Sequence, residues 1–551
     1  MCYNERKRIK ALKKFLIRKI KKREQKTMGI WLNPDNTAFQ ESVNSEIYVD
    51  KTMLIAYTNS VIGTEQKNIC VSRPRRFGKS MTAKMLAAYY SCGCDSAQIF
   101  SRWRISESAS YKQFLNQYNV IFINMQDFFS RTGQVIEMLE CLEKSIISEL
   151  QKRYHFISES DKNLVCVLEK IYQEDKSGFV FIIDEWDCIF REKMHDKGQH
   201  TKYLDFLRAL FKDKTYVKLA YMTGILPIKK YGTHSALNMF DEYSMTNTGI
   251  FAEYTGFTED EVHALCEKYN MDYQEAMHWY DGYLVEESLH IYNPKSIVDA
   301  MRRKRFDNYW TQTETYEALK IYIEMNFDGL KDAIVTMLGG GSCRINSRTF
   351  QNDMTTFQSK DDVLTLLVHL GYLSYNSEEK RTFIPNAEIV EEFANTIEGT
   401  DWNEVTKALV LSEKLLESTY RQDEKTVAEL IDEAHGTVTS VLNYNDENVL
   451  SCVIHIAYFS AQNYYSLVRE MPAGLGFADV VFCPRKKYAD RPAMVIELKW
   501  DKTATGAIRQ IKDKKYLKAL KGYTGKAYLV GINYDKKSKK HTCKIEVETI
   551  Y

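Results

Sequence analysis

Short apolar runs in the first half of the chain predict strands, and amphipathic stretches between them predict helices. The apolar runs span 69–71, 119–124, 178–184 and 217–223, and the helical patterns span 53–61, 133–154, 161–175 and 203–211. The third run is almost wholly apolar, as expected for a strand that is buried on both faces. Because strands alternate with helices, we expect a parallel sheet with helices on both faces, which is an α/β fold.

The second half of the chain has a helical middle region and then a second α/β pattern. In the middle region, helices are expected at 259–269, 273–280 and 361–369, and a hairpin at 371–385. A helix followed by a hairpin is the shape of a small winged-helix unit. Beyond residue 400, helices at 402–416, 425–435 and 447–462 precede strands at 464–470, 477–482 and 494–500.

These patterns divide the 551 residues into four segments, in line with about three folded domains. They are a basic tail at 1–27, disordered or helical, an α/β unit at 28–256, a helical lid with a winged-helix region at 257–399, and an α/β unit at 400–551. The tail carries twelve Lys or Arg residues and two Glu, which fits an arm for nucleic acid or an anionic surface. It also fits a solvated extension ahead of a start at Met28, which we favour.

Composition narrows the class of protein. The hydrophobic fraction of 44% and the charged fraction of 27% are typical of soluble globular proteins. The net charge is +1, so any binding of nucleic acid or membrane requires a local patch rather than an overall field. The twelve cysteines include no C-x-x-C pair, and no apolar run reaches the length of about eighteen residues that crosses a membrane. We therefore expect a cytoplasmic protein with reduced thiols and no membrane contact.

The stretch Arg73–Ser80, Arg-Pro-Arg-Arg-Phe-Gly-Lys-Ser, joins a predicted strand to a predicted helix. This is the layout of a phosphate-binding P-loop, in which free N–H groups and the helix dipole face an anion. Lys79 would reach the β- and γ-phosphates of a nucleotide, and Ser80 would hold Mg²⁺. The full pattern G-x-x-x-x-G-K-[ST] has glycine where this chain has Arg73, so a chance Gly-Lys-Ser at a helix start is the alternative. The expected nucleotide contacts are Arg75, Arg76, Phe77, Gly78, Lys79, Ser80 and Met81.

The third strand supplies acidic residues for the same site. It ends in Asp184-Glu185, which is the Walker B arrangement: Asp184 would hold Mg²⁺ and Glu185 would polarise the attacking water as general base. Taken alone, an Asp-Glu pair at a strand end reads as a helix cap or a solvated turn. Thr223, at the tip of the fourth strand, is placed to sense the γ-phosphate, or else caps the next turn.

These residues resemble the AAA-ATPase-like family of bacterial proteins, which carries arginine in place of the first P-loop glycine. The resembling blocks are 73–80, 48–52, 184–187, 237–238, 254–261, 279–283 and 292–294, within about residues 28–300. Trp186 stands where the family usually has tyrosine. The resemblance implies a P-loop ATPase with ATP and Mg²⁺ as cofactors. Arg191 and Arg208 are candidates for an arginine finger, and a ring, a dimer and a monomer all stay open.

Polar residues of the C-terminal unit form a second constellation. Glu497 and Lys499 lie two apart on one predicted strand, so their side chains point to one face, and Asp479 begins the neighbouring strand. The carboxylates can hold Mg²⁺, and the lysine can position or deprotonate a water that attacks a phosphodiester. Glu447, on the preceding helix, would complete the metal shell, and Gln510 would fix the site from the next helix. A partly solvated Glu–Lys pair on a sheet face is the alternative.

The order and spacing of this set are similar to those of the PD-(D/E)XK nuclease superfamily, with its restriction-endonuclease-like fold. Such a domain commonly follows the AAA-like ATPase. The segment 472–479 resembles the lead-in Gly-x-Gly-x-x-Asp, with Phe477 in place of the family arginine. The resemblance implies a Mg²⁺-dependent endonuclease that acts on DNA or docks to it.

Two functions from different classes fit these patterns. One is an ATPase coupled to a DNA nuclease, and the other is a nucleotide-switched binding module with a catalytically silent nuclease-like domain. An enzyme that acts on a small phosphorylated substrate fits the P-loop but not the C-terminal strands. Because Glu185 and the second acidic set are both present, we favour the first function, with ATP and DNA as partners.

Overall fold

The computed structural model describes most of the chain after the basic tail. The described residues are 28–228, 230–231, 234–235, 237–286, 289–310, 316–325, 327–351, 356–400, 402–439, 447–473, 476–520 and 523–551. The tail predicted at 1–27 lies outside them. Within these ranges, no helix has both the length and the apolar character needed to cross a membrane.

A five-stranded parallel sheet forms the centre of the N-terminal unit, as the alternation of strands and helices predicts. Its order is β2-β3-β4-β1-β7, and every neighbouring pair is parallel. The strands are β1 (Asn68–Ser72), β2 (Asn119–Asn124), β3 (Phe179–Asp184), β4 (Val217–Gly224) and β7 (Asp241–Tyr243). Four of them match the apolar runs of the sequence. The edge strand β7 is not among the predicted elements.

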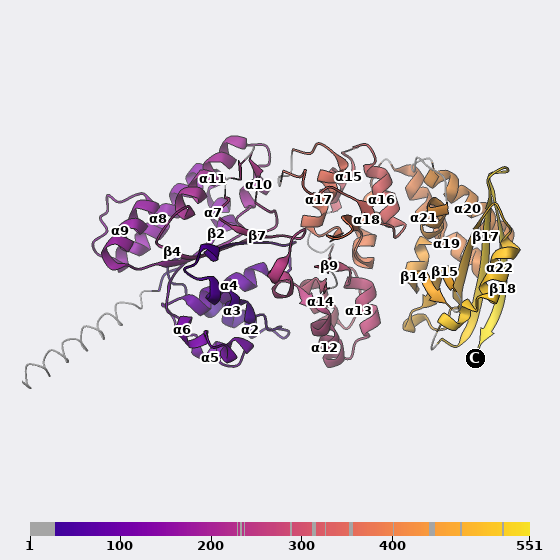
Figure 1. Cartoon of the computed structure of the whole chain (residues 1–551), viewed down its shortest axis with the longest axis horizontal. Helices are drawn as coiled ribbons and strands as arrows, with labels where there is room; N and C mark the ends of the chain where they lie inside the picture. Colours follow the sequence, from indigo (N-terminus) through magenta and orange to yellow (C-terminus); the bar gives the residue numbers. More distant parts are fainter. Residues whose placement is uncertain are drawn as a thin grey trace, which may run out of the picture.

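Helices cover both faces of this sheet (Figure 1). On β3, Phe179, Phe181 and Ile183 pack into one buried cluster, and Val180 and Ile182 pack into another on the opposite face. The first cluster includes helices α7 (Met125–Thr132), α8 (Val135–Arg153), α9 (Leu164–Asp175), α10 (Cys188–Glu192) and α11 (Lys197–Phe211). The second includes α2 (Thr37–Val43), α3 (Met53–Val61), α4 (Lys79–Tyr90), α5 (Ala97–Phe100) and α6 (Tyr111–Phe114). A strand buried on both faces explains the continuous apolar run.

The middle region is mainly helical, as expected, and contains two small sheets. One has the order β8-β10-β9, with β8 (Phe257–Thr258), β9 (Tyr283–Val285) and β10 (Leu289–Tyr292), beside α12 (Glu259–Tyr269), α13 (Tyr273–Tyr280) and α14 (Pro294–Arg303). The other has the order β11-β13-β12, with β11 (Cys343–Arg344), β12 (Ser374–Asn376) and β13 (Arg381–Phe383). Around it lie α15 (Tyr316–Ile323), α16 (Leu330–Leu338), α17 (Lys360–Leu370) and α18 (Ala387–Glu398). The expected helix and hairpin are α17, β12 and β13; their assignment to the winged-helix class stays a prediction.

The C-terminal unit is a mixed sheet with helices on both faces. The order is β14-β15-β16-β17-β18, in which only β16 and β17 are parallel. The strands are β14 (Tyr465–Ala473), β15 (Gly476–Pro484), β16 (Ala493–Trp500), β17 (Gly525–Asp535) and β18 (Lys540–Ile550). The helices are α19 (Asn403–Tyr420), α20 (Glu424–Thr439) and α21 (Glu447–Ala457), with α22 (Ala504–Asp513) between β16 and β17.

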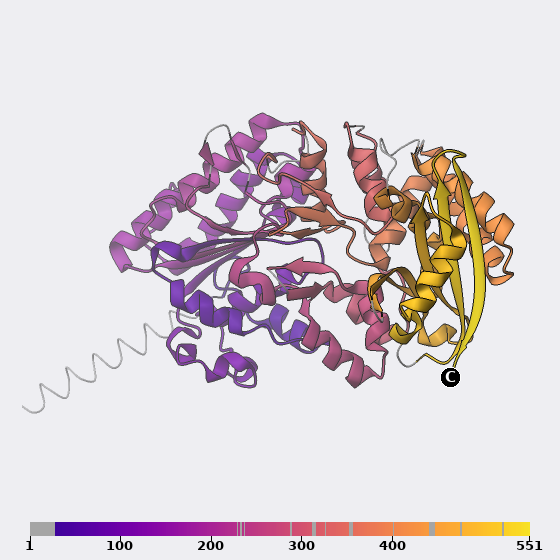
Figure 2. The same ribbon diagram turned by 45° about the vertical axis from the view of Figure 1, so that its right-hand side comes forward.

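Side-chain alternation on β16 decides what each face of this sheet carries. Met494, Ile496 and Leu498 share a buried cluster with α19, α20 and α21, whereas Val495 packs with Ile508 of α22. Odd-numbered residues of β16 therefore face α22, which puts Glu497 and Lys499 on the same side as this helix. The three units follow one another in chain order along the long axis of the molecule (Figures 1 and 2).

Candidate nucleotide and nuclease-like sites

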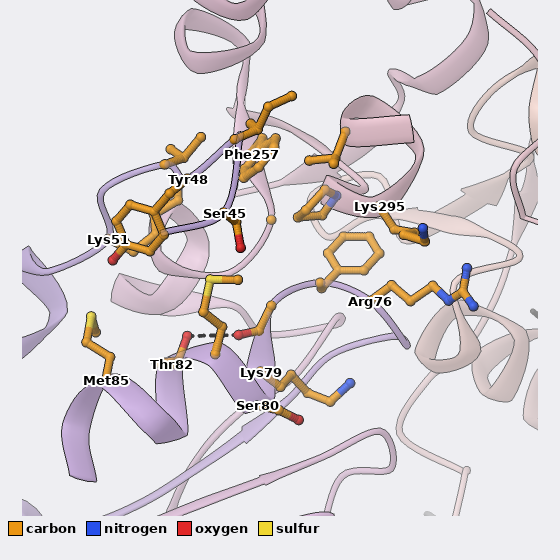
Figure 3. A pocket seen from close by; sticks show the side chains of 18 of the residues that line it. Ser45, Tyr48, Lys51, Arg76, Lys79, Ser80, Thr82, Met85, Phe257 and Lys295 are labelled. Atoms are coloured by element: carbon orange, nitrogen blue, oxygen red, sulfur yellow. Dashed lines mark hydrogen bonds between the residues drawn. The ribbon is translucent and has the colours of Figure 1, made fainter. Parts of the chain in front are cut away.

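A cavity of about 860 Å³ opens at the N-terminus of α4, where the sequence predicts a bound nucleotide. Its floor is the P-loop from Arg75 to Thr82, and Glu185 reaches it from the end of β3. The segments 45–51 and 254–257 and the first turns of α14 form the other walls. Figure 3 shows Lys79 and Ser80 at the start of α4, with Tyr48, Phe257 and Lys295 across the cavity.

The first turn of α4 is open to an anion. Gly78 is the N-cap residue at φ +89°, a left-handed conformation that glycine adopts without strain. No side chain caps this helix end, and its first turn carries no acidic residue. Its free N–H groups and the positive end of the helix dipole therefore face the cavity without a competing acceptor from the cap.

Lys79 lies buried beneath this helix start. Its Nζ donates to the main-chain oxygens of Arg73 at 2.9 Å and Pro74 at 2.7 Å. Burial lowers the pKa of Lys79, and the carboxylates of Glu185, Asp187 and Asp184 oppose this shift. The ammonium group thus lies within electrostatic reach of the acidic residues that follow β3.

Arg73 takes a structural role at the position where a common P-loop has glycine. Its side chain is buried; Nε donates to Thr255 Oγ1 at 2.9 Å, and Nη1 donates to the oxygens of Ser72 at 3.0 Å and Tyr243 at 3.2 Å. Burial lowers the pKa of Arg73 to about 10. The guanidinium therefore ties the loop to β7 and to the segment that enters the middle region, contacts that glycine has no atoms to make.

Asp184 is held at the end of β3 by two donors. Thr223 donates its hydroxyl proton to Asp184 Oδ1, and the N–H of Glu185 donates to the same oxygen at 3.1 Å. Strand β4, which carries Thr223, lies between β1 and β3. Lys79, at the start of the helix that follows β1, therefore lies at the same edge of the sheet as Thr223 of β4 and Asp184 of β3.

Glu185 is paired with an arginine of its own chain. Arg191 Nη2 contacts Glu185 Oε2, and Arg191 Nε lies 3.3 Å from Asp187 Oδ2. Burial raises the pKa of Glu185, while Arg191 and Lys79 oppose the shift. Arg191 therefore belongs to this site within the chain. The other arginine-finger candidate, Arg208, lies on α11 at 3.8 Å from Asp205.

Asp187 is a functional candidate that the sequence prediction did not include. Its Oδ2 accepts hydrogen bonds from the N–H groups of Ile225 at 3.0 Å and Leu226 at 2.8 Å, and the side chain is fully buried. These bonds fix the turn after β4 against the turn after β3. The signal was present in the sequence, because Asp187 ends the same Asp-Glu-Trp-Asp block as Asp184.

The C-terminal constellation also converges. Asp479 Oδ2 accepts from the N–H of Leu498 at 2.7 Å, and Lys499 Nζ donates to Glu497 Oε1 at 2.7 Å. Gln510 Nε2, from α22, donates to the same oxygen of Glu497. Burial, followed by the charge of Asp479, raises the pKa of Glu497 to about 7, so the two carboxylates lie close to each other. Asp479 lies inside β15 rather than at its start.

The second carboxylate oxygen of Glu497, Oε2, is suited to bind a cation. Glu497 Oε2 is buried and has no hydrogen-bond partner among the described residues. A buried carboxylate oxygen without a donor is costly unless a cation or a proton satisfies it. With Asp479 beside it, the pair fits Mg²⁺, which one or two carboxylates commonly bind. No group of three or more His, Cys, Asp or Glu side chains suited to a metal occurs in the described part of the chain.

The sequence predicts Glu447 for this second site but not Tyr516. Glu447 begins α21, but its side chain lies outside the described residues, so its predicted place in the metal shell stays a prediction. Tyr516 is buried beside the acidic pair, where its hydroxyl oxygen lies 3.2 Å from Gln510 Nε2. The sequence prediction did not include Tyr516, because a tyrosine six residues after Gln510 carries no spacing signal of its own.

Comparison with known proteins finds a matching family model for the N-terminal unit and for the C-terminal unit. Residues 37–233 match the family model described as predicted AAA-ATPase, and residues 445–544 match the model of the PD-(D/E)XK nuclease superfamily. Both resemblances drawn from the sequence are therefore confirmed. An uncharacterized protein in the vnfD 5′ region of Azotobacter chroococcum mcd 1 is 26% identical over 280 residues, which are 49% of this chain and 51% of that protein. The chain thus spans about half the length of the curated relative that it matches.

Two solved structures share a distant likeness with the chain. One is the ORC2 protein of Aeropyrum pernix in ADPNP–ADP complexes, at 13% identity and a TM-score of 0.29, over 66% of this chain and 98% of that one. The other is a DNA replication initiation factor, at 14% identity and a TM-score of 0.23, over 54% of this chain and 71% of that one.

Proposed function

We propose that the N-terminal unit binds ATP with Mg²⁺ and hydrolyses it, and that the C-terminal unit is a metal-dependent nuclease for DNA. The observation that carries the first half is that Lys79 and Glu185 line a cavity on the open N-terminus of α4, with the buried Asp184 within electrostatic reach of Lys79. A basic group, a metal-ligand carboxylate and a candidate base at one helix start are the parts that phosphoryl transfer requires.

Each residue of the nucleotide site has a distinct role in this proposal. The N–H groups from Arg75 to Met81 bind phosphate oxygens, and Lys79 leaves its two main-chain acceptors to contact the β- and γ-phosphates. Ser80 and Asp184 would hold Mg²⁺, which when bound neutralises charge on the phosphates. Glu185 orients the attacking water and accepts its proton after leaving Arg191. Thr223 holds Asp184 in place and stands next to the γ-phosphate position.

In the C-terminal unit, Asp479 and the unpaired oxygen of Glu497 would hold the metal ion, with Glu447 as a further ligand. Such an ion supplies Lewis-acid stabilisation of the phosphodiester and of the water that attacks it. Lys499 orients this water, and Gln510 fixes Glu497 from α22. The support for this half is the convergence of the four described side chains on one sheet face.

A nucleotide-switched binding module with a silent nuclease-like domain is the second candidate function. The pairing of Glu185 with Arg191 favours it, because a carboxylate engaged by a guanidinium is less available to a water molecule. In that case ATP would bind and change the shape of the chain without turnover, and the C-terminal unit would only dock.

Nucleotide binding by the Lys79→Ala variant tests the ATP site. We expect wild-type protein with Mg²⁺ to bind ATP in a calorimetric titration, and Lys79→Ala to lose binding by about 100-fold or more, as for the loss of a charged phosphate contact. Lys84→Ala, on the same helix, is the matched control and should bind as wild type. Unchanged affinity in Lys79→Ala would refute the phosphate assignment.

A further inference from the structure

A second cavity, of about 800 Å³, lies between the middle region and the C-terminal unit. One wall consists of the segment before α13, this helix itself and the residues that follow α14. The other wall consists of the end of the short helix Phe459–Asn463 and the turn Arg485–Tyr488 after β15. Helix α13 lies beside the C-terminal unit (Figure 1), where its Glu275 pairs with Arg485. We call this cavity the junction groove.

The junction groove carries an excess of positive charge. Its lining includes five cations and three carboxylates. Three ion pairs use the three carboxylates, namely Arg485–Glu275 at 3.1 Å, Lys486–Asp272 at 3.7 Å and Arg305–Asp307 at 2.8 Å. Lys304 and Lys487 are both exposed, and no ion pair joins either to a carboxylate among the described residues; Lys304 Nζ donates to the main-chain oxygen of Tyr269, and Lys487 Nζ lies 5.4 Å from the Tyr488 ring centre. Two cations, one on each wall, therefore lack a carboxylate partner and are available to bind an anion.

Aromatic rings alternate with these charges. Trp279 and Phe306 line one wall, and Tyr464 and Tyr488 line the other, all of them partly exposed. The two tyrosine rings lie 5.3 Å apart and nearly perpendicular, and the Arg485 guanidinium lies 5.6 Å from the Tyr488 ring centre. Flat apolar surfaces between cations are the combination that binds unpaired bases, because every base can stack regardless of its identity.

Arg485 is held in its wall of the junction groove by contacts with both walls. Its side chain is 6% exposed; Nη1 bonds Glu275 of α13, and Nη2 bonds the main-chain oxygen of Asn463. Its Nε is buried and has no hydrogen-bond partner in the described part of the chain. A buried donor without an acceptor is costly, and a bound polar group from solvent or ligand would satisfy it.

We propose that the junction groove binds a segment of single-stranded nucleic acid. Lys304 and Lys487 contact its phosphates from opposite walls, and bases stack on Trp279 and Tyr488. The groove is separate from the nuclease-like site, because Pro484, which precedes the groove residue Arg485, lies five positions after Asp479 on β15, about 17 Å along an extended strand. The inference therefore goes beyond the proposed phosphodiester chemistry and does not depend on it.

Binding of a labelled oligonucleotide to the full chain tests this proposal. The probe is a fluorescent twelve-nucleotide single strand of mixed sequence, as DNA in one arm and RNA in the other. Fluorescence anisotropy is measured on the Asp479→Ala chain with a metal chelator, so that cleavage does not occur. We expect Lys304→Ala/Lys487→Ala to weaken binding by about 10-fold and to lower the salt slope by about 1.4, which is about 0.7 for each phosphate contact. Trp279→Ala should weaken binding by about 10-fold through lost stacking.

The control is Lys112→Ala/Lys152→Ala, which removes two exposed lysines from α6 and α8 of the N-terminal unit. It should bind as the parent does, and all variants should keep the thermal unfolding midpoint of the parent. An equal loss of affinity for the strand in the control and in the groove variant would overturn the proposal. Unchanged affinity in both variants would also overturn it. Preference for duplex of the same length, or displacement of the probe by poly-glutamate at lower concentration than by unlabelled strand, would also overturn it. Preference for DNA or for RNA identifies the natural strand.

Discussion

Lys79 and Glu185 carry opposite charges at the candidate nucleotide site. Each of them already contacts other residues of the same chain. Lys79 donates to two P-loop carbonyls, and Glu185 contacts Arg191. Because burial disfavours the charged form of each, these partners hold the charges in a site that excludes much of the solvent. In the proposed function, both groups exchange partners when phosphates and water enter.

Glu185→Gln should separate nucleotide binding from hydrolysis. The amide keeps the shape of the side chain but cannot accept a proton from water, so phosphate release should decrease by about 100-fold or more while ATP affinity stays within about threefold. Glu192→Gln, an exposed neighbour on α10, is the control and should hydrolyse at the wild-type rate. Full hydrolysis by Glu185→Gln would mean that another group activates the water.

At this scale, the residues that belong to motifs could be predicted from the sequence, but the residues that contact them in the fold could not. Lys79, Asp184, Asp479, Glu497 and Gln510 could be predicted because spacing on a strand or helix places each at a known edge. The partners of these residues come from other elements. Arg191 and Tyr516 reach the two sites through the paths of α10 and of the turn after α22, and no local pattern encodes those paths.

At the scale of elements, burial explains why the strands of the N-terminal sheet could be found in the sequence, except for its edge strand; the buried strand β17 of the C-terminal unit was not predicted. Strands β2, β3 and β4 are mostly apolar, because helices cover both of their faces. Strand β7 has only three residues, Asp241–Tyr243, two of them acidic, so it gives no strand signal. Strand β18 is an edge strand with Lys and Glu on its exposed face, and only its register against β17 defines it.

Glu388 makes α18 sensitive to pH. Burial raises the pKa of Glu388 to about 8, although Ser296 Oγ donates to it at 2.9 Å and the N–H of Tyr309 donates at 2.7 Å. The folded chain therefore keeps a proton that the unfolded chain releases above the ordinary glutamate pKa of 4.5. The stability that this proton contributes is fully present below pH 4.5 and is lost as the pH rises toward about 8. Between these values, the free energy of unfolding decreases by at most about 1.4 kcal/mol for each step of one in pH.

Thermal unfolding of Glu388→Gln at about pH 5.5 and about pH 8.5 measures this contribution. The wild-type midpoint should decrease more than the variant midpoint between the two pH values, because glutamine does not titrate. Glu398→Gln, at the exposed end of the same helix, should follow the wild type. Parallel behaviour of Glu388→Gln and wild type would show that another group causes the pH dependence.

At the scale of the whole molecule, α14 connects the two cavities. Pro294, Lys295 and Val298 of this helix line the nucleotide cavity, and Lys304 and Arg305, directly after it, line the junction groove. The groove is closed on its other side by Arg485, which follows the strand of Asp479. A shift of α14 on nucleotide binding would therefore move one wall of the groove relative to the other.

This arrangement predicts coupling between ATP and single-stranded nucleic acid. ATP with Mg²⁺ should change the dissociation constant of the oligonucleotide by about fivefold or more, and the oligonucleotide should change that of ATP by the same factor. The measurement is anisotropy of the labelled strand at rising ATP concentration, with Lys79→Ala as the control that should show no effect. Equal strand affinity with and without bound ATP would contradict the coupling.

The central claim is that one chain has two separate sites for phosphate chemistry, and a single assay tests it most directly. Protein is incubated with ATP, Mg²⁺ and supercoiled plasmid, and free phosphate and plasmid topology are followed together. Wild type should release phosphate and nick the plasmid, and Asp479→Ala should release phosphate but leave the plasmid supercoiled, whereas Asp490→Ala, an exposed acid of the same unit, should act as wild type. Lys79→Ala should release no phosphate. Plasmid nicking by Asp479→Ala, or phosphate release by Lys79→Ala, would contradict the account.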